Sequence, residues 1–359
     1  MTTANRDALL SLMTLVRPAL ATQSFIPAWT HIRFADGFAT TFNDTASISV
    51  KTPLADLDPV CVPGELFIKT LSSFNAESVL LQDNDTSMVL VAGRSKMKVP
   101  VLPVDDFKMP VLKGKPSELD LSDDILEGVR CCLFSVGTDP THPSQMGVTL
   151  DTTDGRAVLY STDNITLSRY ATKTKLTLPG DAPVILPTFF CEQLLTMSKA
   201  YPDDDMVLEV YPGALRVLFG KKATLLTKTL VDTEPLDFGA VFAKYLDVNA
   251  AKKTLAVLPP SFDAAFNRAL LVLANEADKA ARITVGKGGA VELYAKSQLG
   301  ESTDEFVVAQ ASVRKPFHVD PALVLRAAKT CGSVAFYDRV MLLASDDATF
   351  LHLIAHVAG

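Results

Sequence analysis

The sequence predicts an α+β protein in which one unit of helix, β-hairpin, helix and strand pair occurs three times along 359 residues. Three similar β-hairpins recur, and each of them turns at a glycine. A helix follows each hairpin and begins near a proline, and a second pair of strands follows each helix. Because a repeat of this kind defines the whole fold, it takes precedence over any single motif.

Each unit opens with an amphipathic helix. The second of these spans 122–136, where Ser122 and the acidic residues after it predict a helix cap, and the third spans 259–276. In the first, apolar residues at helical spacing form one stripe: Leu9, Leu12, Met13, Val16 and Leu20.

The hairpins span 31–44, 147–164 and 282–297, with apolar and polar residues alternating on both sides of an Asp-Gly or Gly-Gly pair. This pattern is the strongest short-range signal of a hairpin. The turn glycines are Gly37, Gly155 and Gly289.

The helices after the hairpins begin near Pro63, Pro187 and Pro321, which we expect in the first helical turn, where proline needs no amide partner. The strand pairs after these helices cover 78–93, 206–220 and 334–347.

The repeats predict three domains, 1–115, 116–247 and 248–359, each with its helices on one face of an antiparallel sheet. The joins are a Pro-, Lys- and Gly-rich stretch at 109–117 and a polar stretch at 247–253.

Composition excludes several classes of protein. With 48% hydrophobic and 21% charged residues, the chain is globular rather than disordered. Its net charge of −7 excludes a general basic coat for nucleic acid but leaves room for a local basic surface. No apolar run reaches the ~20 residues of a membrane span, and the first residues do not read as a signal peptide. The five cysteines show no CxxC spacing, which favours reduced thiols in a cytosol.

Catalytic and metal motifs are absent from the sequence: it contains no Walker A loop, GxSxG elbow or HExxH helix. His352 and His356 lie in an alternating, strand-like segment, which disfavours a metal pair. The run Asp203, Asp204 and Asp205 leaves a metal-dependent nuclease as an alternative, although consecutive carboxylates after a proline are more typical of a solvated turn. We therefore expect no enzyme activity, no cofactor and no metal.

The whole chain resembles the bacterial-type DNA sliding clamp, the beta subunit of DNA polymerase III, and its divergence from ordinary bacterial clamps hints at a phage origin. The most specific segments are VPGELFIKTL and AGRSKMKVPVLPVDDF in the first unit and GVTLDTTDGRAVLYSTDNITLSRYA, VILPTFFCEQLL and KTLVDTEPLDF in the second. In the third unit they are FDAAFNRALLVLANE and the C-terminal tail.

The resemblance implies a cytoplasmic, replisome-associated processivity factor, in which two copies close head to tail into a ring with antiparallel sheets outside and helices lining the hole. The implied partners are encircled duplex DNA, the replicative DNA polymerase, a clamp loader and other proteins with clamp-binding motifs, and no membrane.

A sliding ring should touch phosphates weakly and without reading bases. Gln23 and Ser24 stand where the family carries an arginine near the first hairpin. The basic residues expected to face DNA lie on the six repeated helices: Arg17, Lys69, Arg130, Lys199, Arg268, Arg326 and Lys329.

The resemblance also implies a pocket for partner peptides, in which mostly apolar side chains accept a Leu or Phe anchor. The alternative is that these residues form only interdomain core. The matching positions are Thr162, Leu167, Leu236, Val241, His318, Pro321, Val340, Leu342, Leu353 and Ile354. Departures from the family at 164–166 and in the tail at 355–359 predict an altered partner specificity.

The ring interface carries over onto Met97 and Val99 of one copy and Val272 and Leu273 of the other. A clamp-like scaffold or decoy that does not encircle DNA remains an alternative, because the basic residues are sparse and the tail is altered.

Overall fold

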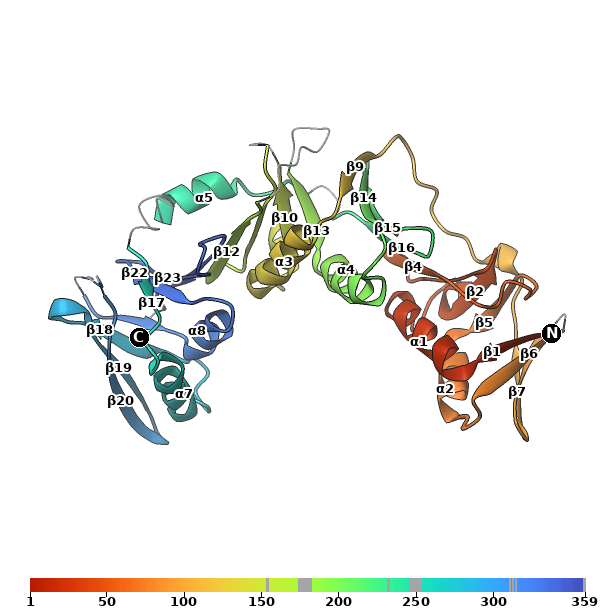
Figure 1. The fold of residues 1–359 in the computed structure, drawn as a ribbon, viewed down its shortest axis with the longest axis horizontal. Coiled ribbons are helices and arrows are strands. Elements are labelled where there is room, and N and C mark those ends of the chain that lie inside the picture. The colour runs from red at the N-terminus through yellow and green to blue at the C-terminus, as the bar shows by residue number, and fades with distance from the viewer. Residues whose placement is uncertain are drawn as a thin grey trace. The chain divides into compact units, whose positions relative to one another are not determined.

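The computed structural model describes residues 1–84, 86–152, 155–173, 183–230, 233–245, 254–309, 311, 313 and 315–357. The chain divides into two compact units, each described by itself below (Figure 1). Unit 1 holds 1–122, 178–180 and 189–231, and unit 2 holds 123–177, 181–188 and 232–359.

Unit 1 contains a four-stranded and an eight-stranded sheet. In spatial order the smaller consists of β1 (Thr2–Asn5), β6 (Ser78–Asn84), β7 (Ser87–Ala92) and β8 (Ser95–Pro100). The larger consists of β5 (Val60–Pro63), β2 (His31–Ala35), β3 (Phe38–Phe42), β4 (Ala46–Lys51), β16 (Ala223–Lys228), β15 (Ala214–Phe219), β14 (Met206–Tyr211) and β9 (Ser117–Asp120).

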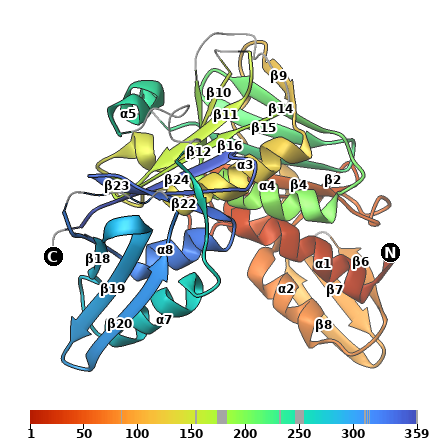
Figure 2. The same cartoon turned by 60° about the vertical axis from the view of Figure 1, so that its left-hand side comes forward.

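Unit 2 repeats this arrangement, and its larger sheet runs across the middle of Figure 2. The larger sheet consists of β13 (Val184–Pro187), β10 (Gly147–Asp151), β11 (Val158–Thr162), β12 (Thr166–Ala171), β24 (Phe350–Ala355), β23 (Val340–Ala344), β22 (Ser333–Phe336) and β17 (Ala256–Val257). The smaller consists of β20 (Gly300–Val307), β19 (Ala290–Ser297), β18 (Ala281–Val285) and β21 (Phe317–Val319).

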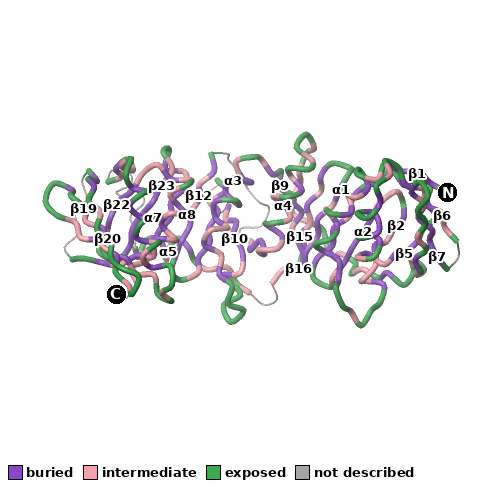
Figure 3. Tube along the Cα trace, turned by 90° about the horizontal axis from the view of Figure 1, so that it is seen from below, coloured by how far each residue is buried: buried purple, intermediate pink, exposed green. Residues whose placement is uncertain are grey.

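The helices bury one apolar face each, as the sequence pattern predicts. In the first helix the buried residues are Leu9, Met13 and Val16. Figure 3 shows the same contrast along the chain, with buried residues in strands and helix faces and exposed residues in the loops. The described α-helices are α1 (Arg6–Val16), α2 (Gly64–Ser73), α3 (Asp123–Cys132), α4 (Thr188–Ala200), α5 (Phe238–Tyr245), α7 (Phe262–Val272) and α8 (Pro321–Ala328).

The three predicted hairpins are confirmed as β2–β3, β10–β11 and β18–β19. Their turn glycines Gly37, Gly155 and Gly289 have φ of 77°, 72° and 81°, a left-handed conformation that other residues adopt only with strain. All pairings between named strands in the described residues are antiparallel, so the predicted α+β class with antiparallel sheets is confirmed.

The proline prediction is right for one helix and wrong for two. Pro321 is the first residue of α8, behind an Asp320 cap whose carboxylate accepts from the Ala322 amide at 2.7 Å. Pro63 and Pro187 instead end strands β5 and β13, one residue before their helices begin. In both cases a strand runs directly into the helix, so the proline closes the strand.

The eight-stranded sheets each join strands that are far apart in the sequence. In unit 1 the join is β4–β16, and in unit 2 it is β12–β24. The middle third of the chain thereby supplies half of each large sheet, while the division into three domains stays a prediction. No helix in the described part of the chain is long and apolar enough to cross a membrane.

Candidate functional site

A pocket of about 290 Å³ opens beside the β12–β24 join of unit 2. Its walls come from the β11–β12 turn, from β23 and β24, and from the segment that leads into α5. The lining residues are Gln145, Thr162, Asn164, Ile165, Thr166, Leu167, Leu236, Val241, Val340, Leu353 and Ala355.

The β11–β12 turn is held rigidly by its own side chains. The Asp163 carboxylate accepts from the Ile165 amide at 3.0 Å and from the Thr166 amide, and Asn164 has a φ of 70°. The Thr162 hydroxyl donates to the Thr166 carbonyl at 2.7 Å, so it belongs to the turn. This geometry turns Ile165 outward, where 48% of its surface is exposed at the pocket.

Beneath the pocket lies an apolar cluster that includes Leu167, Val340 and Leu353. The rings of Tyr160 and Phe238 stack in this cluster with centroids 5.1 Å apart and planes 4° from parallel. The stack ties the start of α5 to β11, and this places Leu236 and Val241 at the pocket wall.

The rim of the pocket is polar and uncharged. Gln145 and Asn164 exchange two hydrogen bonds, at 2.8 and 3.1 Å between their amide groups. None of the lining residues carries a charge. Small-molecule sites usually span roughly 300–1,000 Å³, so this pocket suits one or two apolar side chains of a peptide.

The structure brings together six of the ten residues predicted for the partner pocket: Thr162, Leu167, Leu236, Val241, Val340 and Leu353. Leu342 lies in the cluster beneath the pocket and does not line it, and Ile354 points to the other face of β24 from Leu353. Pro321 is buried at the start of α8. None of these three side chains lines this cavity, and their part in binding a partner stays a prediction.

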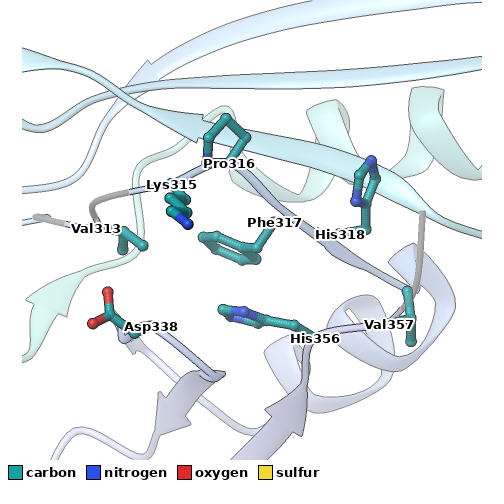
Figure 4. A pocket seen from close by; sticks show the side chains of 8 residues that line it. All are labelled: Val313, Lys315, Pro316, Phe317, His318, Asp338, His356 and Val357. Carbon is teal, nitrogen blue, oxygen red and sulfur yellow. The ribbon is translucent and has the colours of Figure 1, made fainter.

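His318 lines a different cavity, of about 430 Å³, so its part in partner binding also stays a prediction (Figure 4). Here the rings of Phe317 and His356 stack with centroids 3.9 Å apart, beside Lys315 and Asp338. Burial lowers the pKa of His356 to about 4, and burial together with the nearby Arg282 lowers the pKa of His318. Both rings are therefore neutral at pH 7.

Sequence reasoning missed Gln145, and it named Asn164, Ile165, Thr166 and Ala355 only as departures from the family and not as lining residues. The sequence could have predicted the exposure of Ile165, because an isoleucine directly after Asp-Asn lies in a turn and not in a strand that packs on the core. Gln145 carried no such signal, since a short 3-10 helix at Pro143–Gln145 brings it to the rim.

The seven basic residues predicted to face DNA lie on or directly beside the repeated helices, but three are paired within the chain. Arg17 forms two hydrogen bonds with Glu65, at 2.8 and 3.0 Å, and Arg130 pairs with Glu127. Arg268 pairs with Asp304 at 2.5 Å. Hydrogen bonds from these arginines lower the pKa of Glu65 and of Glu127, so both carboxylates stay charged and offset the arginines.

The four other basic residues, Lys69, Lys199, Arg326 and Lys329, are exposed. None of them has an ion pair among the described residues. The Arg326 guanidinium lies 5.0 Å from the centre of the Phe134 ring.

Two of the four residues predicted for the ring interface are buried within the single chain, and the interface itself stays a prediction. Val99 is 0% exposed and Leu273 is 2% exposed within the single chain, so both belong to its core. Val99 alternates with Lys96 and Lys98, which are exposed on β8, and Leu271 is the exposed apolar residue near the end of α7.

The metal alternatives find no support in the described part of the chain, which holds no cluster of His, Cys, Asp and Glu suited to a metal ion. The Asp204 carboxylate pairs with Lys222 at 2.8 Å, while Asp203 and Asp205 are exposed. His352 is buried, and a hydrogen bond of 2.9 Å joins its ring nitrogen Nδ1 to the Ser168 hydroxyl.

No protein-family model and no curated protein matches the sequence. Solved structures of bacterial DNA sliding clamps match the fold over 99% of both chains. The DNA polymerase sliding clamp of Pseudomonas aeruginosa matches with a TM-score of 0.86 at 16% identity. The DnaN sliding clamp of Bartonella birtlesii, bound to griselimycin, matches with a TM-score of 0.85 at 17% sequence identity. The beta sliding clamp of C. crescentus matches with a TM-score of 0.84 at 18% sequence identity. The chain therefore has the fold of bacterial DNA sliding clamps.

Proposed function

We propose that this chain is a DNA polymerase processivity factor, a sliding clamp that forms a homodimeric ring around duplex DNA and tethers its partners through short peptides. The observation that carries the proposal is the clamp fold over the whole chain, combined with two sheet edges that the internal repeat leaves unpaired. The activity is topological, so it needs no catalytic group.

Among the edge strands of the described sheets, β8 and β20 are the two whose equivalents in the repeat are paired within the chain. In the repeat, β4 and β12 are equivalent to β20, while β16 and β24 are equivalent to β8. Two of these equivalent pairs, β4–β16 and β12–β24, are joined within the chain. The third pairing, β20 with β8, is completed when a second copy supplies the missing strand, and a free edge otherwise invites uncontrolled pairing.

Charge complementarity supports the same pairing. Lys96 and Lys98 are exposed on β8, whereas Glu301 and Glu305 are exposed on β20. Opposite charges on facing strands favour this antiparallel contact, and like charges disfavour β8 with β8 or β20 with β20. A head-to-tail dimer follows from this asymmetry.

The DNA and the partners meet different parts of each chain in this proposal. Lys69, Lys199, Arg326 and Lys329 supply a weak, sequence-independent attraction to phosphates, which falls steeply with salt. The pocket at Ile165 and Val340 accepts the apolar anchor of a polymerase or repair-protein peptide. A clamp loader and a cytoplasmic, replisome-associated setting belong to the same proposal.

The test combines solution mass with retention on DNA. We expect a dimer that is retained on nicked circular DNA after loading and slides off the same DNA once it is linearised. Reversing Lys96 and Lys98 to Glu should yield monomers, and reversing Glu301 and Glu305 to Lys in the same chain should restore the dimer. A wild-type chain that stays monomeric at micromolar concentration, or that stays on linear DNA, contradicts the proposal.

A second candidate is a clamp-like scaffold that does not encircle DNA. The pairing of Arg17, Arg130 and Arg268 with carboxylates of their own chain favours it, because it removes three of seven expected phosphate contacts. Stimulation of a cognate polymerase on long primed templates separates the two, since a scaffold would bind the polymerase without extending its product length.

A further inference from the structure

A second cavity, of about 240 Å³, lies in unit 1 beside the β4–β16 join. The turn after β3, the tight β14–β15 turn, the end of β16 and the linker that follows β8 form its walls. The lining residues are Phe42, Thr45, Pro110, Val111, Leu112, Lys113, Pro212, Gly213, Ala214, Leu226, Thr227 and Lys228.

The strand register makes this cavity the internal counterpart of the first pocket. Leu226 lies opposite Ser47 across the β4–β16 join, as Leu353 lies opposite Leu167 across β12–β24. One strand further, Ala214 pairs with Lys228 as Val340 pairs with Ala355. Leu226, Lys228 and Ala214 therefore stand where the first pocket has Leu353, Ala355 and Val340.

The turns beside the two cavities are built in the same way. The Asn43 side chain accepts from the amides of Thr45 and Ala46 at 3.1 and 2.8 Å, as Asp163 does for Ile165 and Thr166. Asp44 has a φ of 75°, matching the 70° of Asn164.

Beside each cavity, the strand join ends in an equivalent backbone hydrogen bond. The Lys228 amide donates to the Thr45 carbonyl at 2.9 Å, and the Ala355 amide donates to the Ile165 carbonyl at 2.8 Å. The linker at 110–113 takes the place that Leu236 and Val241 hold in the first pocket.

The two cavities differ in charge. The first has no charged lining residue, whereas Lys113 and Lys228 line the second, and Lys115 is exposed two residues further on. One of these ammonium groups, on Lys228, lies 2.9 Å from the Asp44 carboxylate, which leaves a net positive rim. Val111 is 83% exposed at this rim and adds an apolar surface that the described residues leave uncovered.

We propose that the cavity at Val111, Leu226 and Lys113 is a second peptide-docking groove, which takes an extended partner segment with an apolar anchor flanked by aspartate or glutamate. The apolar floor of Leu226 and Ala214 accepts the anchor, and the lysine rim attracts the acidic flanks. One chain would then hold two partners at once, a neutral apolar peptide at the first pocket and an acidic one at the second. The inference rests on the proposed function only in taking the first pocket as a peptide site.

The test uses two labelled synthetic peptides with the same Leu-Phe anchor, one flanked by aspartates and one flanked by serines, on the full chain. Fluorescence anisotropy gives affinities, and a photo-reactive leucine in each anchor gives the site by mass spectrometry. We expect the acidic peptide to crosslink to residues 110–113 or 212–214, with an affinity that falls as salt rises.

Variants at exposed positions separate the two grooves without disturbing the core. Lys113→Glu and Val111→Ser should each lower the affinity for the acidic peptide by roughly threefold to tenfold. Neither change should alter the affinity for the serine-flanked peptide. The matched change Ile165→Ser should lower the affinity for the serine-flanked peptide and leave the affinity for the acidic peptide unchanged.

Each outcome tests the inference separately from the proposed function. Crosslinks of the acidic peptide that fall only at 162–167 or 340–355, or no binding at millimolar concentration, overturn the second groove even if the first pocket binds. Acidic-peptide crosslinks at 110–113 with no binding at the first pocket support the second groove and count against the proposed function.

Discussion

The two long sheets share a backbone plan, but the centres of their joins are chemically opposite. At equivalent positions of the register, unit 1 pairs Ile48 with Leu225, and unit 2 pairs Ser168 with His352. All four side chains are buried. In unit 2 the Ser168 hydroxyl is shared between Ser135, at 2.8 Å, and the His352 ring, at 2.9 Å.

Strand pairing at these joins therefore tolerates either an apolar or a polar centre, provided that every buried polar group has a partner. The apolar join depends on packing alone and is insensitive to protonation. The polar join depends on an uncharged imidazole, because burial lowers the pKa of His352 to about 3.

The largest effect is expected when the polar side chain is moved into the apolar join. Leu225→His should destabilise unit 1 by about 3–5 kcal/mol, because it removes packed methyl groups and buries a polar ring with no partner. Trp29, the single tryptophan, lies in unit 1 and reports its unfolding by fluorescence. The control Leu225→Met should cost less than about 1.5 kcal/mol. Equal unfolding midpoints for Leu225→His and Leu225→Met would mean that the β4–β16 join is loosely packed.

Acid should weaken unit 2 through His352. The folded-state pKa of His352, about 3, lies below the ordinary value of 6.5. Below pH 6.5 the unfolded chain therefore binds a proton at His352, whereas the folded chain keeps the ring uncharged. Stability is therefore lost as pH falls from 6.5 towards 3, by about 2 kcal/mol between pH 7 and pH 5. Amide exchange in 166–171 and 350–355 measures the loss, and His352→Gln should remove the share of His352 while the share of His356, whose pKa is also lowered, remains. An unchanged pH dependence in that variant would assign the effect to another group.

Removing one hydroxyl should give a smaller effect in unit 2. Ser168→Ala leaves the His352 ring without its partner in a buried site, which costs about 1–3 kcal/mol. Ile48→Val at the equivalent position of unit 1 removes one methylene and should cost about 0.5–1.5 kcal/mol. Urea unfolding followed by amide exchange compares the two joins. A smaller loss for Ser168→Ala than for Ile48→Val would contradict the polar account.

The smallest effect on stability is expected at the two pocket turns. Ile165→Ser changes an exposed side chain and should alter stability by less than about 0.5 kcal/mol, while it weakens a serine-flanked Leu-Phe peptide several-fold. Thr45→Ser at the matching turn should leave both quantities unchanged. A large loss of stability with Ile165→Ser would mean that this residue is part of the core.

Much of the fold could be predicted because its signals are local. The alternation around Gly37, Gly155 and Gly289 specifies hairpins, and the positive φ at each glycine is a backbone requirement visible in the sequence. The site was predicted in part, through apolar positions such as Leu167 and Val340. Periodicity places a side chain on a face but does not say whether that face meets the core, which is why the burial of the Val99 and Leu273 side chains was not predicted.

The sequence by itself determined the threefold order of helices and strands, the antiparallel class and the absence of familiar catalytic motifs, because each follows from residue type and near-neighbour spacing. Only the tertiary structure decided which distant strands join, since β4–β16 and β12–β24 bring together residues over 170 positions apart in the chain. It also decided which pockets those joins open and which arginines are already paired. These features depend on long-range register and on side-chain contacts, and no local pattern in the chain encodes them.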